Sequence, residues 1–380
     1  MKKRLTIWPD TDDELLLKAA LWKGPEALLA WQELKPLLKL DEQVNFDEKI
    51  YRKNYSDVDT AINRGLFQNG YEHYILHGRY EGRTCANEGL YRLLPLVYKN
   101  LENLGYKDEL TPKLKGMYRL IWYKNQKLCH NVKGILHALH DQGILVMLLK
   151  GWPLLTLYYR DLGSRPMKDL DIFVRHCDTL RAIKILREQG WNHKSDWAGP
   201  GKNIEPEHNL DLRHACNFAN HSGADIDLHW HALDECREAG ADDVFWRYAT
   251  PFLSADLPLC VPHPTEMLLH ICLHGLHHNP FCLNCRWLAD LSKILEVSCR
   301  EIAWDRLVVE ARRRGFSLWI KECLVYLHEV LQVAIPPQTI RKFAGSVSPK
   351  VSLAHKRMAG DVEYTILESL VDYSDNHQTH

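Results

Sequence analysis

The pattern of hydrophobic and polar positions divides the chain into helical ends and a centre with a different period. Residues 11–40 carry apolar positions at helical spacing with a break at Gly24-Pro25, which predicts two amphipathic helices. Helical spacing returns over residues 91–143 and ends in a long helix over residues 118–142. Four further helices are predicted toward the end of the chain, over residues 264–278, 284–297, 304–314 and 318–333.

The centre of the chain begins with a strand and a turn. Ile144–Leu149 is a short apolar run that ends sharply at Lys150-Gly151, which predicts a buried strand followed by a turn. Residues 152–159 are apolar on every side, so they fit a short helix packed on a sheet. Gly151 would let the chain approach a phosphate, and the N-terminus of the following helix offers free N–H groups to it.

A second strand is predicted over Asp169–Val174, where polar and apolar residues alternate with period two. The carboxylates of Asp169 and Asp171 then point to one face of the strand, and two apolar side chains point to the other. Neighbouring carboxylates repel one another, and a divalent cation is the usual compensation. Mg²⁺ takes oxygen ligands and is commonly completed by substrate phosphates, so the pair predicts a magnesium and nucleotide site.

The sheet is expected to continue beyond this strand. Residues 178–189 have the spacing of a helix that ends at Gly190. Residues 208–218 fit a strand that pairs antiparallel with the later segment ADIDLHWHAL at the edge of the sheet. The polar residues of this region are candidates to line a pocket, or ordinary satisfied polar groups: Glu207, His208 and His214.

The order of strand, Lys-Gly turn, helix and GSRPMKDLD resembles the nucleotidyltransferase superfamily of DNA polymerase β-like enzymes. More closely, it resembles an uncharacterised bacterial nucleotidyltransferase family that reads KG, then YY, then RPM-x-D-x-D. The resemblance implies an α+β fold, with a small mixed-sheet nucleotidyltransferase core flanked by N-terminal and C-terminal helical regions. It also implies transfer of a nucleoside monophosphate from an NTP, with ATP the first choice, to an acceptor, with release of pyrophosphate.

The resemblance implies three catalytic carboxylates that also hold Mg²⁺. Asp169 and Asp171 supply the first two, and the third comes from the later strand, in which Asp225, Asp227 and His229 share one face. The family pattern D-L-H-W favours Asp227, and Asp225 is the alternative. The predicted metal ligands and catalytic groups are therefore Asp169, Asp171 and Asp227.

Four residues are predicted to hold the nucleotide. The turn at Gly151 would seat the β- and γ-phosphates, with Lys150 beside it as a charge-neutralising group. Arg165 is a second such group, or else a partner in a structural ion pair. Ser164, with Gly163, forms a rival phosphate-binding signature, although only four residues separate it from Asp169, too few for the helix that normally lies between.

Six regions follow from these patterns. They are N-terminal helices (1–42), an inserted helical module (43–88), a helical region (89–143), the nucleotidyltransferase core (144–233), a C-terminal helical domain (234–345) and a tail (346–380). The insert resembles a small bacterial helical module with the form F-D-x-x-x-Y, E-H-Y and G-x-x-E-G-R. Capping and buried hydrogen bonds account for its His73 and Glu81, so a docking or spacing role is predicted.

The C-terminal helices contain a histidine and cysteine cluster. His270 and His274 are one helical turn apart, and Cys282 and Cys285 have the spacing of zinc ligands, so a four-coordinate zinc site is conceivable. The family pattern L-H-x-C-x-H-x-x-x-H has the histidines without requiring the cysteines. This favours a packed or substrate-facing helix.

Composition adds limits on partners and compartment. The net charge of the 380-residue chain is −1, which makes a long nucleic acid an unexpected partner, although local basic patches are compatible with it. The eleven cysteines lack the spacing of a disulfide framework, and no apolar stretch has the length of a secretory signal or a membrane span. A cytoplasmic protein that does not bind membranes is therefore predicted.

The leading hypothesis is a Mg²⁺-dependent nucleotidyltransferase. Its partners would be a nucleoside triphosphate and an acceptor that is a small molecule, a sugar, a peptide or a protein. One alternative is a catalytically weak nucleotide-binding scaffold protein, against which the intact carboxylates argue. Another is a toxin-like tRNA nucleotidyltransferase, which rests on a likeness to the abortive-infection toxins, whose turn reads KGG, and against which the absence of a clear basic face in the sequence argues.

Overall fold

The computed structural model describes residues 11–38, 48, 51–52, 55–78, 88–194, 210–254, 256–278 and 285–343. Within this part of the chain, the structure contains helices and one seven-stranded sheet with parallel and antiparallel pairs, so the fold class is α+β as predicted. The chain divides into two compact units. Unit 1 comprises Met1–Tyr118 and Phe281–Ala289, and unit 2 comprises Arg119–Pro280 and Asp290–His380.

Unit 1 is helical over its described residues. Its helices are α1 (Thr11–Leu21), α2 (Pro25–Leu34), α4 (Ser56–Asn63), α5 (Gly70–His73) and α6 (Glu88–Asn103). The predicted helix pair with a break at Gly24-Pro25 is confirmed, because Gly24 caps α2 with a φ of 74° and Pro25 is its first residue. Helix α1 packs against α2 and α6.

The inserted module contains a buried hydrogen bond, as predicted for His73. His73 is buried, and its Nδ1 lies 3.0 Å from the hydroxyl of Tyr51. The carboxylate of Glu48 accepts from the backbone N–H of Gly70 at 2.8 Å, at the start of α5. Glu81 lies outside the described residues.

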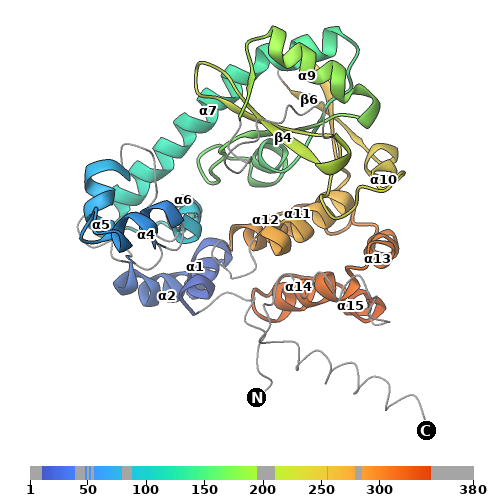
Figure 1. The fold of residues 1–380 in the computed structure, drawn as a ribbon. Coiled ribbons are helices and arrows are strands. Elements are labelled where there is room, and N and C mark those ends of the chain that lie inside the picture. Colours follow the sequence, from blue (N-terminus) through green and yellow to red (C-terminus); the bar gives the residue numbers. More distant parts are fainter. Residues whose placement is uncertain are drawn as a thin grey trace. The chain divides into compact units, whose positions relative to one another are not determined.

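Unit 2 is built around the sheet (Figure 1). The strand order is β3-β4-β5-β2-β1-β7-β6. The pairs β2/β5 and β1/β7 are parallel, and the other neighbours are antiparallel. The strands are β1 (Met147–Leu148), β2 (Leu170–Phe173), β3 (Asn192–His193), β4 (Ala215–Ala219), β5 (Asp225–His229), β6 (Thr250–Ser254) and β7 (Leu257–Val261).

The two faces of the sheet differ in chemistry. On one face, Leu170, Ile172, Ile226 and Leu228 join a hydrophobic core with the second half of α7 (Thr111–Asp141) and with α9 (Thr179–Glu188). The alternate residues of β2 and β5 face the opposite side, where α10 (Asp243–Arg247) and α11 (Pro264–His278) lie (Figure 1). The carboxylates of both strands are on that second face.

The connection after β1 follows the prediction. Residues 151–159 form one turn of α-helix, α8 (Gly151–Pro153), that continues as the π-helical segment η3 (Leu154–Tyr159). The four predicted C-terminal helices are confirmed as α11, α12 (Arg286–Ser298), α13 (Trp304–Arg313) and α14 (Ser317–Glu329), and α15 (Pro337–Lys342) follows them. The predicted tail from residue 346 lies outside the described residues.

Two expectations about the sheet were wrong. The region after residue 233 was predicted to be helical, but β6 and β7 form a hairpin there, and β7 lies parallel to β1 inside the sheet, so the sheet extends past the predicted core boundary to Val261. Strand β4 was placed at the sheet edge, but β3 pairs with it on the outside. Among the described helices, none combines the length and apolar character that crossing a bilayer requires.

Candidate active site

Strand register brings two of the predicted carboxylates together. Strands β2 and β5 are parallel neighbours, and Asp171 is the residue paired directly with Asp227. Both side chains project to the face of the sheet away from the hydrophobic core, since their neighbours along each strand are core residues. Asp171 is 5% exposed, so this pair of carboxylates is largely withdrawn from water.

A histidine that was not among the predicted site residues completes the cluster. His229 is 1% exposed, and its Nε2 lies 2.9 Å from Oδ2 of Asp227 and 3.4 Å from Oδ1 of Asp171. One ligand atom from each of the three residues lies within 4.8 Å of the others, which is compatible with a shared metal ion. The signal was present in the sequence, because His229 is two positions after Asp227 on the same strand face.

Lys150 supplies the nearest positive charge. Its Nζ lies 2.5 Å from Oδ1 of Asp171 and 3.3 Å from Nε2 of His274 on α11. The backbone of Lys150 has a φ of 45°, which is unusual for a residue with a side chain. The turn after β1 thus directs this ammonium group at the carboxylates at a cost in backbone strain, as expected for a residue held in place for a role in the site.

The cluster is strongly coupled electrostatically. Burial opposes ionisation of Asp171 and Asp227, but Lys150 and His229 outweigh it and hold the pKa of each carboxyl below its usual range. Burial would likewise lower the pKa of His229, yet the charge of Asp227 and the contacts with both carboxylates raise it to about 9. At neutral pH, therefore, two cations neutralise two carboxylates.

Asp169 belongs to the same charge cluster but lies outside the three-residue group. It directly precedes β2. Burial, followed by the charges of Asp171 and Asp227, raises its pKa to about 6. Asp169 is therefore the carboxylate with the least compensation, and the one that gains most from an added cation.

Asp225, the alternative third carboxylate, is separated from the cluster. Its two oxygens each lie 2.9 Å from Nζ of Lys194. Its neighbour in register is Ala219 on β4, whereas Asp227 lies opposite Asp171. The geometry thus favours Asp227, as the family pattern implied.

Gly163 and Ser164, the rival phosphate-binding signature, use their backbone N–H groups within a turn. The backbone N–H groups of Gly163 and Ser164 both donate to Oδ1 of Asp161, at 2.7 Å and 2.9 Å. The side chain of Ser164 is buried. These amides already have an acceptor, so the structure gives no support to the predicted nucleotide contact of Ser164, and Gly151 is the better candidate.

Arg165 forms the structural ion pair that was its second predicted alternative. Its Nε and Nη2 donate to the two carboxylate oxygens of Asp290, at 2.8 Å and 2.9 Å, and both residues are buried. The hydroxyl of Tyr159 also donates to Asp290, at 2.8 Å. The remaining nitrogen, Nη1, lies beside Gly151, 3.6 Å from where a Cβ would stand. The pair therefore fixes the loop next to the Lys-Gly turn.

Asn125 on α7 clamps the same loop, a role that the sequence did not reveal. Its Nδ2 donates to the carbonyl oxygens of Leu162 and Arg165, at 2.7 Å and 2.8 Å, and its Oδ1 accepts from the N–H of Met167 at 3.0 Å. Met167 covers Gly151 so closely that a Cβ there would lie 2.8 Å from its sulfur. A side chain at this position would require Met167 to shift.

The other polar candidates have local partners or lie outside the described residues. Nδ1 of His214 lies 3.1 Å from Asp234, which fits a satisfied polar group. Glu207, His208 and Cys282 are outside the described part of the chain, so the zinc alternative stays untested.

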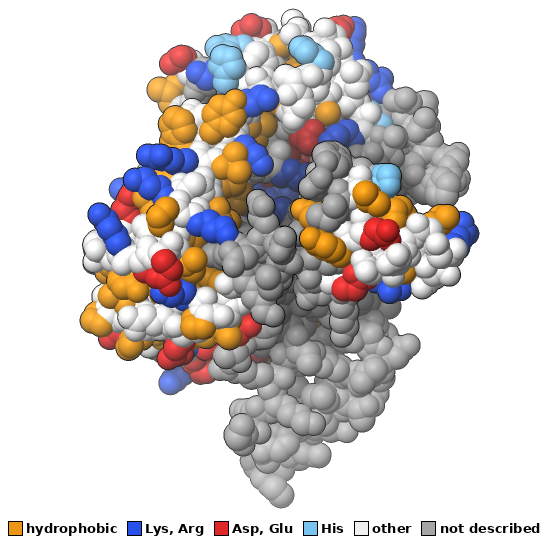
Figure 2. Space-filling model, turned by 90° about the vertical axis from the view of Figure 1, so that its left-hand side faces the viewer, with side chains coloured by type: hydrophobic (Ala, Val, Ile, Leu, Met, Phe, Trp, Pro, Cys, Tyr) orange, Lys and Arg blue, Asp and Glu red, His pale blue; other side chains and the backbone are white. Residues whose placement is uncertain are grey.

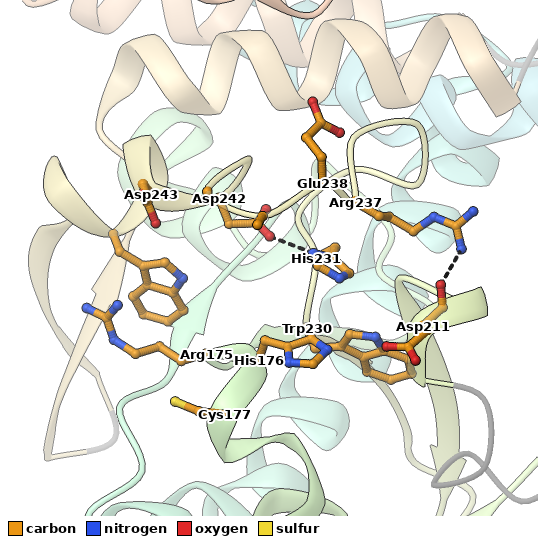
Figure 3. A pocket seen from close by; sticks show the side chains of 13 residues that line it. Arg175, His176, Cys177, Asp211, Trp230, His231, Arg237, Glu238, Asp242 and Asp243 are labelled. Atoms are coloured by element: carbon orange, nitrogen blue, oxygen red, sulfur yellow. Dashed lines mark hydrogen bonds and ion pairs between the residues drawn. The ribbon is translucent and has the colours of Figure 1, made fainter.

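A cavity of about 540 Å³ lies beyond the carboxyl ends of β2 and β5 (Figure 3). Arg175 and His231 line it, each four positions after a carboxylate of the cluster, or ~13 Å along an extended strand. Nδ1 of His231 lies 2.8 Å from Asp242, and the guanidinium of Arg175 lies 4.7 Å from the ring centre of Trp246. The carboxylate cluster does not line this cavity, so the two are separate places on one face of the sheet.

The donor set of the cluster fits a divalent cation. Asp171 and Asp227 lie in register on neighbouring strands, and Asp169 is two residues before Asp171 on the same face. Together they offer the oxygen ligands that Mg²⁺ and Mn²⁺ prefer. Lys150 and His229 already bring two positive charges to Asp171 and Asp227, so the negative charge that remains for an added cation is that of Asp169.

Several solved structures resemble the chain at low identity. Lincosamide antibiotic adenylyltransferase LnuA in its lincomycin-bound form is 15% identical with a TM-score of 0.29, covering 43% of this chain and 93% of its own. An antigenic nucleotidyltransferase-like protein from Paracoccidioides brasiliensis is 13% identical with a TM-score of 0.38, covering 57% and 96%. JHP933 from Helicobacter pylori is 15% identical with a TM-score of 0.29, covering 66% and 97%. No curated protein matches the sequence.

The sequence itself matches a family profile over residues 90–332, described as "Uncharacterised nucleotidyltransferase". This range includes the Lys-Gly turn, the carboxylate cluster and the C-terminal helices through α14, and it begins after the inserted module. The match extends over more than half of the chain, which therefore belongs to the uncharacterised nucleotidyltransferase family.

Proposed function

We propose that this protein transfers a nucleoside monophosphate from an NTP, with ATP the first choice, to an acceptor, and that the reaction depends on Mg²⁺. The observation that carries the proposal is the direct register of Asp171 and Asp227 on parallel strands, with Lys150 and His229 in contact with them. Carboxylates arranged in this way can bind a divalent cation together with the phosphates of a nucleoside triphosphate.

Each residue then has a distinct task. Asp171 and Asp227 would hold Mg²⁺ with Asp169, and the metal would supply charge stabilisation at the phosphates. Gly151 and the first turn of α8 seat the β- and γ-phosphates, with Lys150 beside them. Arg165 keeps the loop in place through Asp290, with its free nitrogen beside Gly151.

The bond changes follow from the substrate. An acceptor oxygen forms a bond to the α-phosphorus, the bond to the bridging oxygen of the β-phosphate breaks, and pyrophosphate leaves. The acceptor proton passes to water, because His229 and Lys150 hold the pKa of the Asp227 carboxyl below its usual range and make it a weak base. The eleven cysteines without framework spacing support a cytoplasmic setting for this reaction.

Incubation of the purified protein with each labelled NTP, Mg²⁺ or Mn²⁺ and cell lysate tests the proposal. We expect a labelled product and pyrophosphate with wild-type protein, and neither with Asp171→Asn. Asp225→Asn is the matched control, because it alters a carboxylate on the same strand as Asp227 that is held by Lys194 instead. Absence of product with all four NTPs, together with no detectable NTP binding by calorimetry, would overturn the proposal.

A further inference from the structure

Helix α7 has a charge distribution that the net charge of the whole chain conceals. From Thr111 to His140 it contains no Asp or Glu, and its first acidic residue is Asp141 at the end. Over the same stretch it carries six basic residues: Lys113, Lys115, Arg119, Lys124, Lys127 and Lys133. A stretch of this length with one sign of charge is unusual in a chain whose net charge is −1.

The positive charges of the unit 2 part of α7 lie on its solvent face. Arg119, Lys124, Lys127 and Lys133 are exposed, while Leu128, Val132 and other residues on the opposite side are in the hydrophobic core. Within the described part of the chain, these four cations form no ion pair. Their charge is therefore available to a partner, and the helix that presents them is fixed to the sheet.

Hydrophobic side chains stand among these charges. Leu120, Trp122 and Tyr123 are 51%, 45% and 60% exposed, although large apolar side chains are normally buried when a helix packs on a core. Tyr123 is four residues after Arg119 and four before Lys127, so the three form one line along the helix. Figure 2 shows Lys and Arg side chains beside hydrophobic ones on the face it presents.

We propose that this face of α7, from Arg119 to Lys133, binds single-stranded nucleic acid. Its cations match a phosphodiester backbone, and Trp122 and Tyr123 match the flat faces of bases, which a single strand exposes and a duplex hides. The face spans ~21 Å of helix. RNA and DNA single strands share both the phosphodiester backbone and the exposed base faces, so both are expected to bind.

The surface goes beyond the proposed transfer reaction, yet it adjoins the site. Asn125, three residues after Trp122 on the same helix, clamps the loop that leads to Asp169. A single-stranded nucleic acid bound to this face would therefore lie on α7, the helix whose Asn125 supports the active-site loop. The near-neutral net charge argues against a long nucleic acid partner but is compatible with local basic patches, and α7 carries such a patch.

Binding is measured with fluorescently labelled oligo(U) and oligo(dT) of twenty nucleotides by anisotropy, in EDTA and without NTP, so the result does not depend on transfer. With four phosphate contacts, log K is expected to fall with log salt at a slope of about −3. Lys124→Ala/Lys127→Ala should make the slope shallower by about 1.4. The matched control is Lys184→Ala/Arg247→Ala, which removes two exposed cations of unit 2 outside α7 and should leave the slope unchanged.

The aromatic side chains give a second, independent measurement. Trp122→Ala/Tyr123→Ala should weaken oligonucleotide binding about tenfold or more with an unchanged salt slope, and Tyr123→Phe should retain affinity. Equal binding of duplex and single strand, or an unchanged affinity of the double variant, would overturn the proposal. Binding to phosphatidylserine vesicles without binding to either oligonucleotide would also overturn it and assign the face to a membrane surface.

Discussion

Unit 2 contains two buried groups of charges that differ in their balance. Arg165 and Asp290 form a closed pair, with two hydrogen bonds between one guanidinium and one carboxylate. The cluster of Asp169, Asp171 and Asp227 has three carboxylates around Lys150 and His229, and Asp169 is left with a pKa of about 6. The charges of the first group cancel, whereas, among the described residues, the second group keeps one negative charge without a positive partner.

The difference in charge balance indicates that the closed pair has a structural role and that the carboxylate cluster has a binding role. A closed pair at 2.8 Å and 2.9 Å needs no ligand and fixes the loop between η3 and β2. A carboxylate whose ionisation is unfavourable in the folded protein lowers stability at neutral pH, and a bound cation would relieve that cost. Variants in the two groups should therefore have opposite consequences.

The largest expected effect is on activity. Asp171→Asn should lower transfer by at least ~10³-fold, because Asp171 contacts both Lys150 and His229 and lies in register with Asp227. Turnover is measured as pyrophosphate release with the acceptor fraction of lysate. Circular dichroism of the variant serves as the control for folding, and turnover near the wild-type rate in a folded variant would remove Asp171 from the site.

The closed pair should show its effect in stability. Asp290→Asn leaves the guanidinium of Arg165 buried without a negative partner, which costs about 3–5 kcal/mol. Thermal and urea unfolding measure this loss. The double variant Arg165→Met/Asp290→Asn removes the orphaned charge while keeping an acceptor for Tyr159, so it should recover much of the stability. If the double variant is as unstable as the single one, the ion pair is not the cause.

Much of this arrangement could be predicted from the sequence, because it depends on local periodicity. Period two along DLDIFV and DIDLH assigned the carboxylates to one face, and the structure has the alternate residues Leu170 and Ile172 in the core. The helix that follows the Lys-Gly turn and the helices after residue 263 are also local patterns. The choice of Asp227 over Asp225 was an inference from the family pattern, and its register with Asp171 was not predicted.

The features that were missed depend on residues far apart in the chain. The sequence did not predict β7, because its place beside β1 depends on pairing with residues more than a hundred positions earlier in the chain. Asn125 interrupts the apolar side of α7, which was a usable signal, but its partners at Leu162 to Met167 could not be known. The pairing of Arg165 with Asp290 likewise joins a loop to a distant helix.

Asp169 gives the opposite stability effect to Asp290. Its pKa in the folded protein is about 6 against an ordinary 3.8, so its ionisation destabilises the metal-free protein at pH 7, and Asp169→Asn should stabilise it by about 1–3 kcal/mol. As pH falls through 6 toward 4, wild-type Asp169 takes up its proton in the folded state and the difference should disappear. Melting temperatures in EDTA from pH 4 to 8 measure both. A destabilised variant at pH 7 would place Asp169 among the paired groups.

The smallest effect is expected at Asp225, which has its own partner away from the cluster. Its pair with Lys194 is partly exposed, so Asp225→Ala should cost about 0–1 kcal/mol and change turnover by no more than about twofold.

Asp227→Ala removes the carboxylate that lies opposite Asp171 and contacts His229. The variant should lose turnover more than NTP affinity, because the nucleotide keeps Asp171 and its own phosphates as metal ligands. Turnover and NTP affinity in Mg²⁺ decide between the two residues. A reversed order would move the third carboxylate to Asp225, and small effects at both would leave the register of β2 and β5 without a role in catalysis.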